Sequence, residues 1–173
     1  MTPRLLAISG LPGVGKTTVA AAIARRLSAV HLSIDAIEEA LLGCGLPAGR
    51  EVGIAAYEAA RAIAELNLRL GADVVVDAVN DSDDARQTWC GASRSTGAQL
   101  LFVHLVISDR GEHRRRLEER DRGFAHVPEP RWDQVLLRAA ESSPWTDEHL
   151  ELDTAELPVH EVVDAVLARL APS

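Results

Sequence analysis

The chain has 173 residues, of which 47% are hydrophobic and 25% are charged. This length and composition are typical of one soluble globular domain and argue against a disordered chain. Every apolar run is far shorter than the roughly 20 residues that a membrane helix needs, and the start of the chain does not resemble a secretory leader. Two isolated cysteines, Cys44 and Cys90, exclude a disulfide framework and a cysteine-based zinc cluster. We therefore expect a reduced, cytoplasmic protein with no membrane anchor.

The charge is distributed unevenly along the sequence. The formal net charge is −8, which argues against general affinity for nucleic acid. Residues 1–34 nevertheless contain four bases and no acid, and residues 110–122 contain six arginines against four acids. Lys16 is the only lysine among 18 basic residues, which suggests a place where a compact point charge fits and a planar guanidinium does not. These two regions are candidate anion-binding segments, although solvated surface charge is an equally good explanation.

Short apolar strands alternate with helices along the chain. This alternation predicts an α/β fold in which a parallel sheet is covered by helices on both faces. The predicted strands are residues 5–9, 30–34, 73–77, 99–107 and 149–153, and the predicted helices are residues 17–27, 36–42, 54–70, 83–96, 110–120, 130–141 and 159–170. No linker or internal repeat divides the sequence, so we expect a single domain over residues 1–173.

Residues 10–17, GLPGVGKT, match the P-loop pattern of a glycine, four residues and then Gly-Lys-Thr. The glycines let the backbone curl so that successive N–H groups point at phosphate oxygens, and the following helix adds its positive end. Lys16 is expected to bridge the β- and γ-phosphates, and the Thr17 hydroxyl to ligate Mg²⁺. The predicted nucleotide-binding residues in this segment are Gly10, Pro12, Gly13, Val14, Gly15, Lys16, Thr17 and, less directly, Thr18.

A guanine-reading Asn-Lys-x-Asp motif is impossible here, because the only lysine lies in the P-loop. With residues 32–35, 74–80 and 116–120, the P-loop resembles the kinase group that holds phage-type polynucleotide kinases, chloramphenicol phosphotransferase, gluconate kinase and zeta toxins. The resemblance covers nearly the whole chain. It implies a three-layer P-loop NTPase fold with a five-stranded parallel sheet in the order 2-3-1-4-5, an arginine lid at residues 110–130, and the use of ATP and Mg²⁺.

Asp35 follows the second predicted strand. The resemblance implies that it is the general base, which accepts the proton of the attacking hydroxyl; a helix N-cap is the alternative, and both roles can coexist. Polynucleotide kinases carry an arginine three residues further on, where this chain has Glu38. A carboxylate there would repel a phosphorylated or polymeric acceptor and suit a hydroxylated or amine-bearing small molecule, unless Glu38 is simply exposed helix surface.

Asp77 ends the third predicted strand, as the acid of the second P-loop motif does. It is expected either to hold an Mg²⁺-bound water, to orient the acceptor, or to cap the strand. Asn80 in the next loop is a candidate contact for the acceptor or the γ-phosphate, and Arg86 is either an anion contact or a surface residue. The six histidines show no convincing metal-ligand spacing, and we expect His104 to be structural.

Arg116 and Arg120 are separated by four residues and would share one face of a helix. The resemblance implies that arginines at this spacing close over the phosphates, where bidentate pairing is favourable. Arg120 is also a candidate nucleotide contact. An exposed, salt-bridged helix is the alternative, because four acids are interleaved with these arginines.

Three functions remain open at this stage. The first is an ATP- and Mg²⁺-dependent kinase that phosphorylates a hydroxyl of a small molecule, with Asp35, Lys16 and the lid arginines in catalysis. The second is a polynucleotide 5′-hydroxyl kinase, which the net charge and Glu38 disfavour. The third is a nucleotide-binding switch with slow hydrolysis. The sequence does not identify the acceptor or the oligomeric state.

Overall fold

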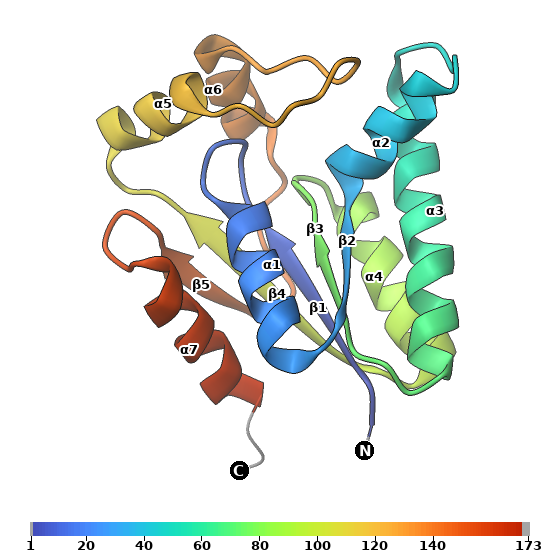
Figure 1. The fold of residues 1–173 in the computed structure, drawn as a ribbon. Coiled ribbons are helices and arrows are strands. Elements are labelled where there is room, and N and C mark those ends of the chain that lie inside the picture. The colour runs from blue at the N-terminus through green and yellow to red at the C-terminus, as the bar shows by residue number, and fades with distance from the viewer. Residues whose placement is uncertain (1, 171–173) are drawn as a thin grey trace.

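The computed structural model of the protein describes residues 2–170. Its centre is a five-stranded parallel sheet in the order β2-β3-β1-β4-β5, as expected (Figure 1). The strands are β1 Arg4–Ser9, β2 Val30–Ser33, β3 Val74–Asp77, β4 Gln99–Val106 and β5 His149–Asp153. Because every strand runs in the same direction, the segments that follow β1, β2 and β3 meet at one edge of the sheet.

Helices form a layer on each face of the sheet and a cover over its carboxyl edge. The helices are α1 Lys16–Leu27, α2 Ile34–Gly43, α3 Arg50–Arg69, α4 Asp83–Thr96, α5 Arg110–Glu119, α6 Trp132–Glu141 and α7 Val159–Leu170. Figure 1 shows α1 and α7 in front of the sheet, α3 and α4 on the other side, and α5 and α6 above the ends of the strands. Among the residues described, no helix is both long and apolar enough to cross a membrane.

The alternation of side chains along β1 divides the core into two halves. Leu5 and Ala7 point to the cluster that includes Trp89 and α3, whereas Leu6 and Ile8 point to the cluster that includes α1 and α7. Successive strand residues face opposite sides of a sheet, so a strand buried on both sides is apolar throughout. The two clusters hold the carboxyl edge of β1, and therefore the P-loop, in a fixed position.

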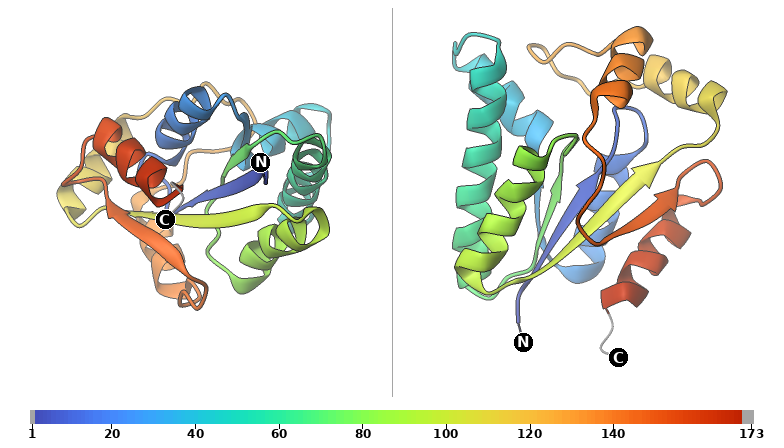
Figure 2. Two further views of the ribbon diagram at one scale, coloured as in Figure 1. Left: turned by 90° about the horizontal axis from the view of Figure 1, so that it is seen from below. Right: turned by 180° about the vertical axis from the view of Figure 1, so that it is seen from behind.

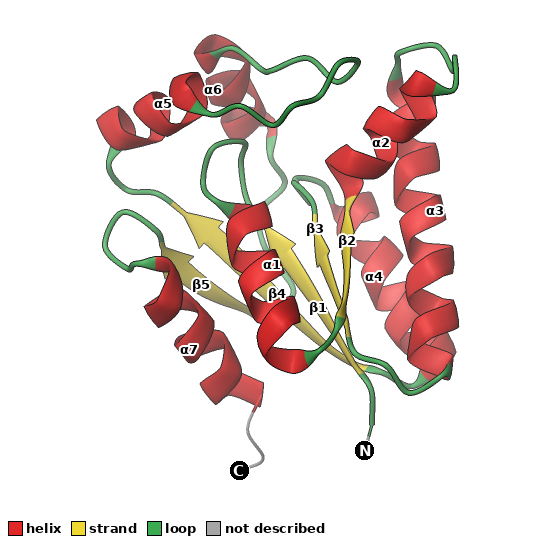
Figure 3. Cartoon of the chain, viewed as in Figure 1, coloured by secondary structure: helices red, strands yellow, loops and turns green. Residues whose placement is uncertain are grey.

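The observed elements differ from the predicted ones mainly at their ends. Helix α2 starts at Ile34 rather than at residue 36, so that Asp35 lies inside its first turn and not before it. The N-cap Ser33 makes no side-chain cap hydrogen bond, because its hydroxyl donates to Asp77 instead (3.3 Å). Helix α5 ends at Glu119, one residue before Arg120. Figure 3 shows the long loop that then leads to α6 over the strand ends.

Candidate functional site: a P-loop beneath an arginine lid

The P-loop follows β1 and requires glycine at two positions for different reasons. Gly10 has φ 142°, and a Cβ at this position would collide with the carbonyl oxygen of Leu105 in β4. Gly13 has φ 91°, and a Cβ there would lie 3.2 Å from the His113 ring and 3.3 Å from Leu117, both on α5. The first glycine therefore lets the loop pass close to the sheet. The second lets the lid helix pack directly on the loop.

Lys16 is the first residue of α1 and is almost buried, with 9% of its surface exposed. Its Nζ donates to the carbonyl oxygen of Leu11 on the opposite side of the loop (3.0 Å). Burial lowers the pKa of Lys16 to about 8, although Asp35 and Asp77 act in the opposite direction. The ammonium is thus placed among the inward-curling backbone of the loop, where phosphates bind in this motif.

Nucleotide binding is expected to be coupled to proton uptake. In the free protein the pKa of Lys16 is about 8. Phosphate anions favour the charged form of Lys16 and raise its pKa, so Lys16 takes up a proton when phosphate binds. The uptake should be near zero at pH 7, about half a proton at pH 8, and close to one proton at pH 9.5. Calorimetry of ADP binding in buffers of different ionisation enthalpy measures it. An uptake independent of pH across this range would contradict the assignment.

Thr17 and Asp77 are brought into direct contact. The Thr17 hydroxyl donates to Asp77 Oδ1 (2.8 Å), and Asp77 Oδ2 lies 2.7 Å from Nε2 of His31. With Ser33, these residues present hydroxyl and carboxylate oxygens next to Lys16. Oxygen donors of this kind are the ligands that Mg²⁺ prefers. The residues present therefore fit an Mg²⁺ ion held through Thr17 and Asp77, the two residues that the sequence suggests for this ion. The pairing of Asp77 with His31 was not foreseen.

Asp35 lies in the first turn of α2 and faces the lid. Arg122 donates to Asp35 Oδ2 (2.6 Å), and the same guanidinium donates to Glu129 (2.5 Å) and lies 4.8 Å from the centre of the Phe124 ring. The side chain of Asp35 is 40% exposed. Its carboxylate does not accept a cap hydrogen bond from α2, since its partner is the lid. Asp35 is therefore open to the cavities described below and is held by a neighbouring cation.

Arg116 and Arg120 do not share a helix face, which corrects the prediction. Arg120 is the extended residue that follows α5, and its guanidinium pairs with Glu129 (2.7 Å). Arg116 turns to the loop after β5, where it donates to the carbonyl oxygen of Thr154 (3.0 Å) and pairs with Glu112 (2.7 Å). The positive charge of Arg120 acts to lower the pKa of Lys16. Arg122, two residues beyond Arg120, is the second lid arginine over the site.

The lid is attached to the body at two points that the sequence analysis missed. On α5, His113 donates through Nε2 to the carbonyl oxygen of Pro12 (2.8 Å) and is buried with Leu117. Beyond α5, Glu39 on α2 accepts from the backbone N–H of Val127 (2.7 Å) and of Ala125 (2.8 Å). The spacing of His113 and Leu117 by four residues, within an otherwise charged segment, was a usable signal of a buried face.

Asn80 and Arg86 are framework residues, and the expected substrate contacts of both are corrected accordingly. Asn80 is 1% exposed, donates through Nδ2 to Ser9 (2.8 Å) and accepts from Trp89 Nε1 (2.9 Å). Arg86 is fully buried and donates to Asp83 and to three carbonyl oxygens, one of which belongs to Asn80. Most of their polar atoms are thus bonded inside the protein, where they fix the loop after β3 against the P-loop.

Two cavities meet above the P-loop. The first, of about 520 Å³, is lined by Lys16 and by the lid residues from Arg120 to Arg138. The second, of about 600 Å³, is bounded by α2, α3 and the start of α4. Both are lined by Asp35, Glu38, Val79 and Arg138, so the two spaces share a wall at these residues. Burial, with Asp35 nearby, raises the pKa of Glu38.

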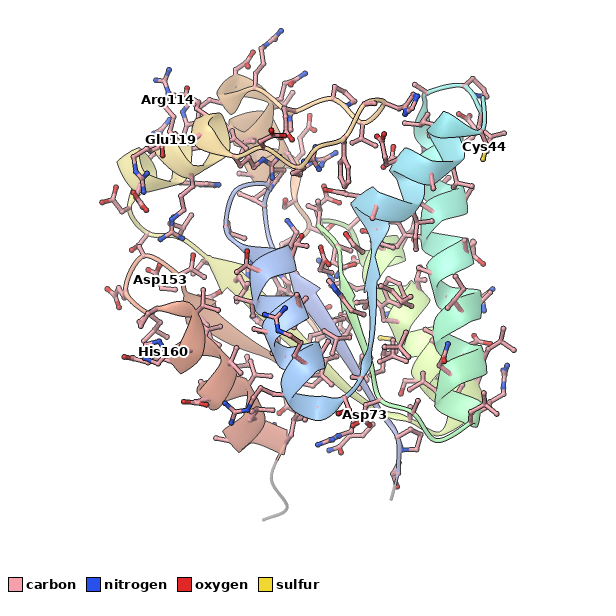
Figure 4. All side chains as sticks on the ribbon, in the orientation of Figure 1. Cys44, Asp73, Arg114, Glu119, Asp153 and His160 are labelled. Carbon is pink, nitrogen blue, oxygen red and sulfur yellow. The ribbon has the colours of Figure 1, made fainter. Side chains whose placement is uncertain are left out.

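The charges of the two cavities are opposite in balance. The first is lined by the cations Lys16, Arg120, Arg122, Arg131 and Arg138 and by the anions Asp35, Glu38 and Glu129. The second is lined by the anions Asp35, Glu38, Glu58, Asp81 and Asp84 and by the cations Arg50 and Arg138. Arg114 and Glu119 project from α5 (Figure 4) and line neither cavity; the Arg114 side chain is 59% exposed. We name the first space the P-loop cavity and the second the acidic cavity.

Two residues that line these cavities were not singled out individually from the sequence. Arg138 on α6 pairs with Asp81 (3.2 Å) and lines both spaces. Tyr57 on α3 lines the acidic cavity and its hydroxyl accepts from the N–H of Asn80 (3.3 Å). No local pattern marks either residue, because both reach the site through long-range packing.

Comparison with solved structures finds the same fold in several kinases. A candidate kinase from Chloroflexus aurantiacus has a TM-score of 0.76 at 22% identity, with 98% of this chain and 96% of that chain covered. The APS kinase of Mycobacterium tuberculosis, solved with AMPPNP and APS, has a TM-score of 0.73 at 18% identity, with 98% of each chain covered. A gluconokinase from Sinorhizobium meliloti has a TM-score of 0.66 at 23% identity, with 98% of this chain and 94% of that chain covered.

Comparison of sequences gives the family. No curated protein matches significantly, but a family model described as an AAA domain matches residues 5–141. This match spans most of the chain and includes the P-loop, Asp35, Asp77 and the lid. The chain therefore belongs to this AAA-domain family and has the fold of the small P-loop kinases.

Proposed function

We propose that the protein is an ATP- and Mg²⁺-dependent kinase that transfers the γ-phosphoryl group to a hydroxyl of a small molecule. The observation that supports this most directly is the shared wall of the two cavities. Lys16 lines the P-loop cavity, and Asp35 lines both. A nucleotide in the P-loop cavity and an acceptor in the acidic cavity would therefore meet beside a carboxylate.

The mechanism assigns one task to each group. The P-loop amides and Lys16 hold the phosphates, and Arg120 and Arg122 neutralise the charge that develops on the transferred group. An Mg²⁺ ion held by Thr17 and Asp77 would neutralise further negative charge of the phosphates. Asp35 accepts the proton of the attacking hydroxyl. Since Arg122 pairs with Asp35 in this structure, the arginine must turn to the phosphates before the carboxylate is fully available.

The acceptor is a hydroxylated molecule without phosphate groups. The acidic cavity carries five carboxylates and two arginines, one of which pairs with Asp81. Such a lining favours neutral or amine-bearing polyols and repels anions. A volume of about 600 Å³ suits a small molecule and not a polymer strand. A polynucleotide 5′-hydroxyl kinase needs a basic channel, so this alternative is disfavoured.

An acceptor panel tests the proposal. Purified protein is incubated with MgATP and sugars, nucleosides, hydroxylated antibiotics, aminoglycosides or a 5′-hydroxyl oligonucleotide, and product masses are measured. Lys16→Ala serves as the blank. We expect a product heavier by one phosphoryl group from a small acceptor, absent from the blank. Labelling of the oligonucleotide alone would favour the polynucleotide alternative, and ADP release that no acceptor accelerates would favour a nucleotide switch.

A further inference from the structure

A second cluster of polar side chains lies outside the two cavities, on the edge strand β5 and its neighbour β4. The ligand atoms of His104, His149 and Glu151 all lie within 4.8 Å of one another. His104 Nδ1 is 3.3 Å from Glu151 Oε2. The three residues come from β4 and β5, and none of them takes part in the mechanism proposed above.

The register of the sheet explains why they meet. In the parallel pairing of β4 with β5, His104 lies opposite Glu151, and His149 lies opposite Phe102. His149 and Glu151 are two residues apart on a strand and so point to the same face. The neighbours on β5, Leu150 and Leu152, point to the opposite face and pack against the α1 and α7 side.

The cluster is open to solvent on one side. Figure 2 (right) shows that, among the elements drawn there, no helix lies over β5 on the face opposite α7. The side chain of Glu151 is 58% exposed and that of His104 is 21% exposed. Trp145 forms the inner wall, with its ring centre 5.0 Å from that of His104 and 4.6 Å from that of His149. A fourth ligand, such as water, therefore has access.

His149 is already oriented as a ligand. Its Nδ1 lies 2.9 Å from the carbonyl oxygen of Asp147. A carbonyl can only accept, so in the neutral ring Nδ1 carries the proton and Nε2 has the lone pair that a metal needs. A backbone carbonyl in this position is the usual support for a histidine that binds a metal. Two imidazoles and one carboxylate with an open fourth position are a typical ligand set for zinc.

We propose that His104, His149 and Glu151 bind a divalent transition-metal ion of the zinc type, which links the edge strand β5 to β4. Zn²⁺ is the best fit, since imidazole and carboxylate ligands disfavour soft Cu(I), and Mg²⁺ requires mostly oxygen ligands. Because the three ligand atoms already lie within 4.8 Å of one another, small rotations of the side chains would let all three contact one zinc ion. The site is independent of the nucleotide site in its residues, so its test does not rest on kinase activity.

Calorimetric titration of the tag-free protein with ZnCl₂ tests the proposal, at neutral pH and with Mg²⁺ in excess so that the Thr17–Asp77 pair is occupied. We expect one strongly bound equivalent, and at least tenfold weaker binding in His149→Ala and in Glu151→Gln. His160→Ala is the matched control, because this side chain is 77% exposed and lies outside the cluster. It should bind Zn²⁺ like the unchanged protein.

A thermal shift gives a second readout. A ligand that binds only the folded state stabilises it, and the gain grows with the ratio of the free ligand concentration to Kd. Zn²⁺ should therefore raise Tm of the unchanged protein and of His160→Ala clearly more than Tm of His149→Ala. Glu151→Gln changes an exposed side chain and keeps the fold testable if His149→Ala folds poorly. Absence of zinc binding in the unchanged protein, or equal binding in Glu151→Gln, would overturn the proposal.

Discussion

Asp35→Asn should lower kcat for phosphoryl transfer by about 10²- to 10⁴-fold, the usual contribution of a positioned general base. Asparagine has nearly the same shape and still accepts a hydrogen bond from Arg122, but it does not take up the proton of the acceptor hydroxyl. Nucleotide affinity should change little, because the P-loop and Lys16 remain intact. Steady-state kinetics with the acceptor found in the panel, together with calorimetry of ADP binding, measure the two effects separately.

The matched control for this variant is Asp84→Asn. Asp84 lines the acidic cavity but not the P-loop cavity, so it shares the electrostatic role of Asp35 without touching the reacting groups. Asp84→Asn should change KM for a cationic acceptor and leave kcat nearly unchanged. If Asp35→Asn kept kcat within threefold of the unchanged enzyme, the carboxylate would not be the base.

Trp89→Ala should lower the free energy of unfolding by about 4 kcal/mol, as expected for removal of a fully buried large aromatic side chain. Trp89 is 0% exposed, packs against Tyr57 with ring centres 5.8 Å apart, and donates to Asn80 (2.9 Å). The substitution leaves a cavity, and it also leaves the side-chain oxygen Oδ1 of Asn80 without its hydrogen-bond donor. Since the free energy of unfolding of a domain of this kind is about 5–15 kcal/mol, the substitution would remove a large part of it.

Urea denaturation followed by circular dichroism measures this loss. Trp89→Phe keeps most of the buried side-chain volume and removes the hydrogen bond to Asn80. It should therefore destabilise the protein much less than Trp89→Ala. Leu70→Ala serves as the surface control, because Leu70 is 85% exposed, and its expected effect is within about 0.5 kcal/mol. A loss in Trp89→Ala no larger than that of Leu70→Ala would show that the core tolerates collapse around this position.

The sequence predicted those parts of the site that follow from local geometry. The glycine spacing of residues 10–17 predicted the P-loop, because Gly10, Gly13 and Gly15 all adopt the positive φ angles that favour glycine. The alternation of apolar strands and helices gave the fold class, and the family resemblance supplied the strand order 2-3-1-4-5 that the structure has. Thr17 and Asp77 were assigned to Mg²⁺ separately, and the structure adds that they touch (2.8 Å), because the neighbouring strands β1 and β3 end at the same edge of the sheet.

Contacts that depend on long-range packing were not predictable. Arg122 reaches Asp35 across 87 positions of the chain, and no pattern near either residue indicates the pairing. Asn80 and Arg86 have the residue types of a substrate site, but contacts with Trp89 and with residues 143–147 use most of their polar atoms internally. His104 and His149 are brought together by strand register alone, so their spacing in the sequence carries no signal.

The scarcity of lysine gives the protein an unusual chemical reactivity. Amine-directed reagents modify the neutral form of an amine, and with a pKa of about 8 a substantial fraction of Lys16 is neutral under mildly alkaline conditions. Lys16 is the only lysine in the chain, so apart from the terminal amine it is the sole target for such reagents. Acylation of a single position would thus report directly on the P-loop, and a bound nucleotide should protect that position.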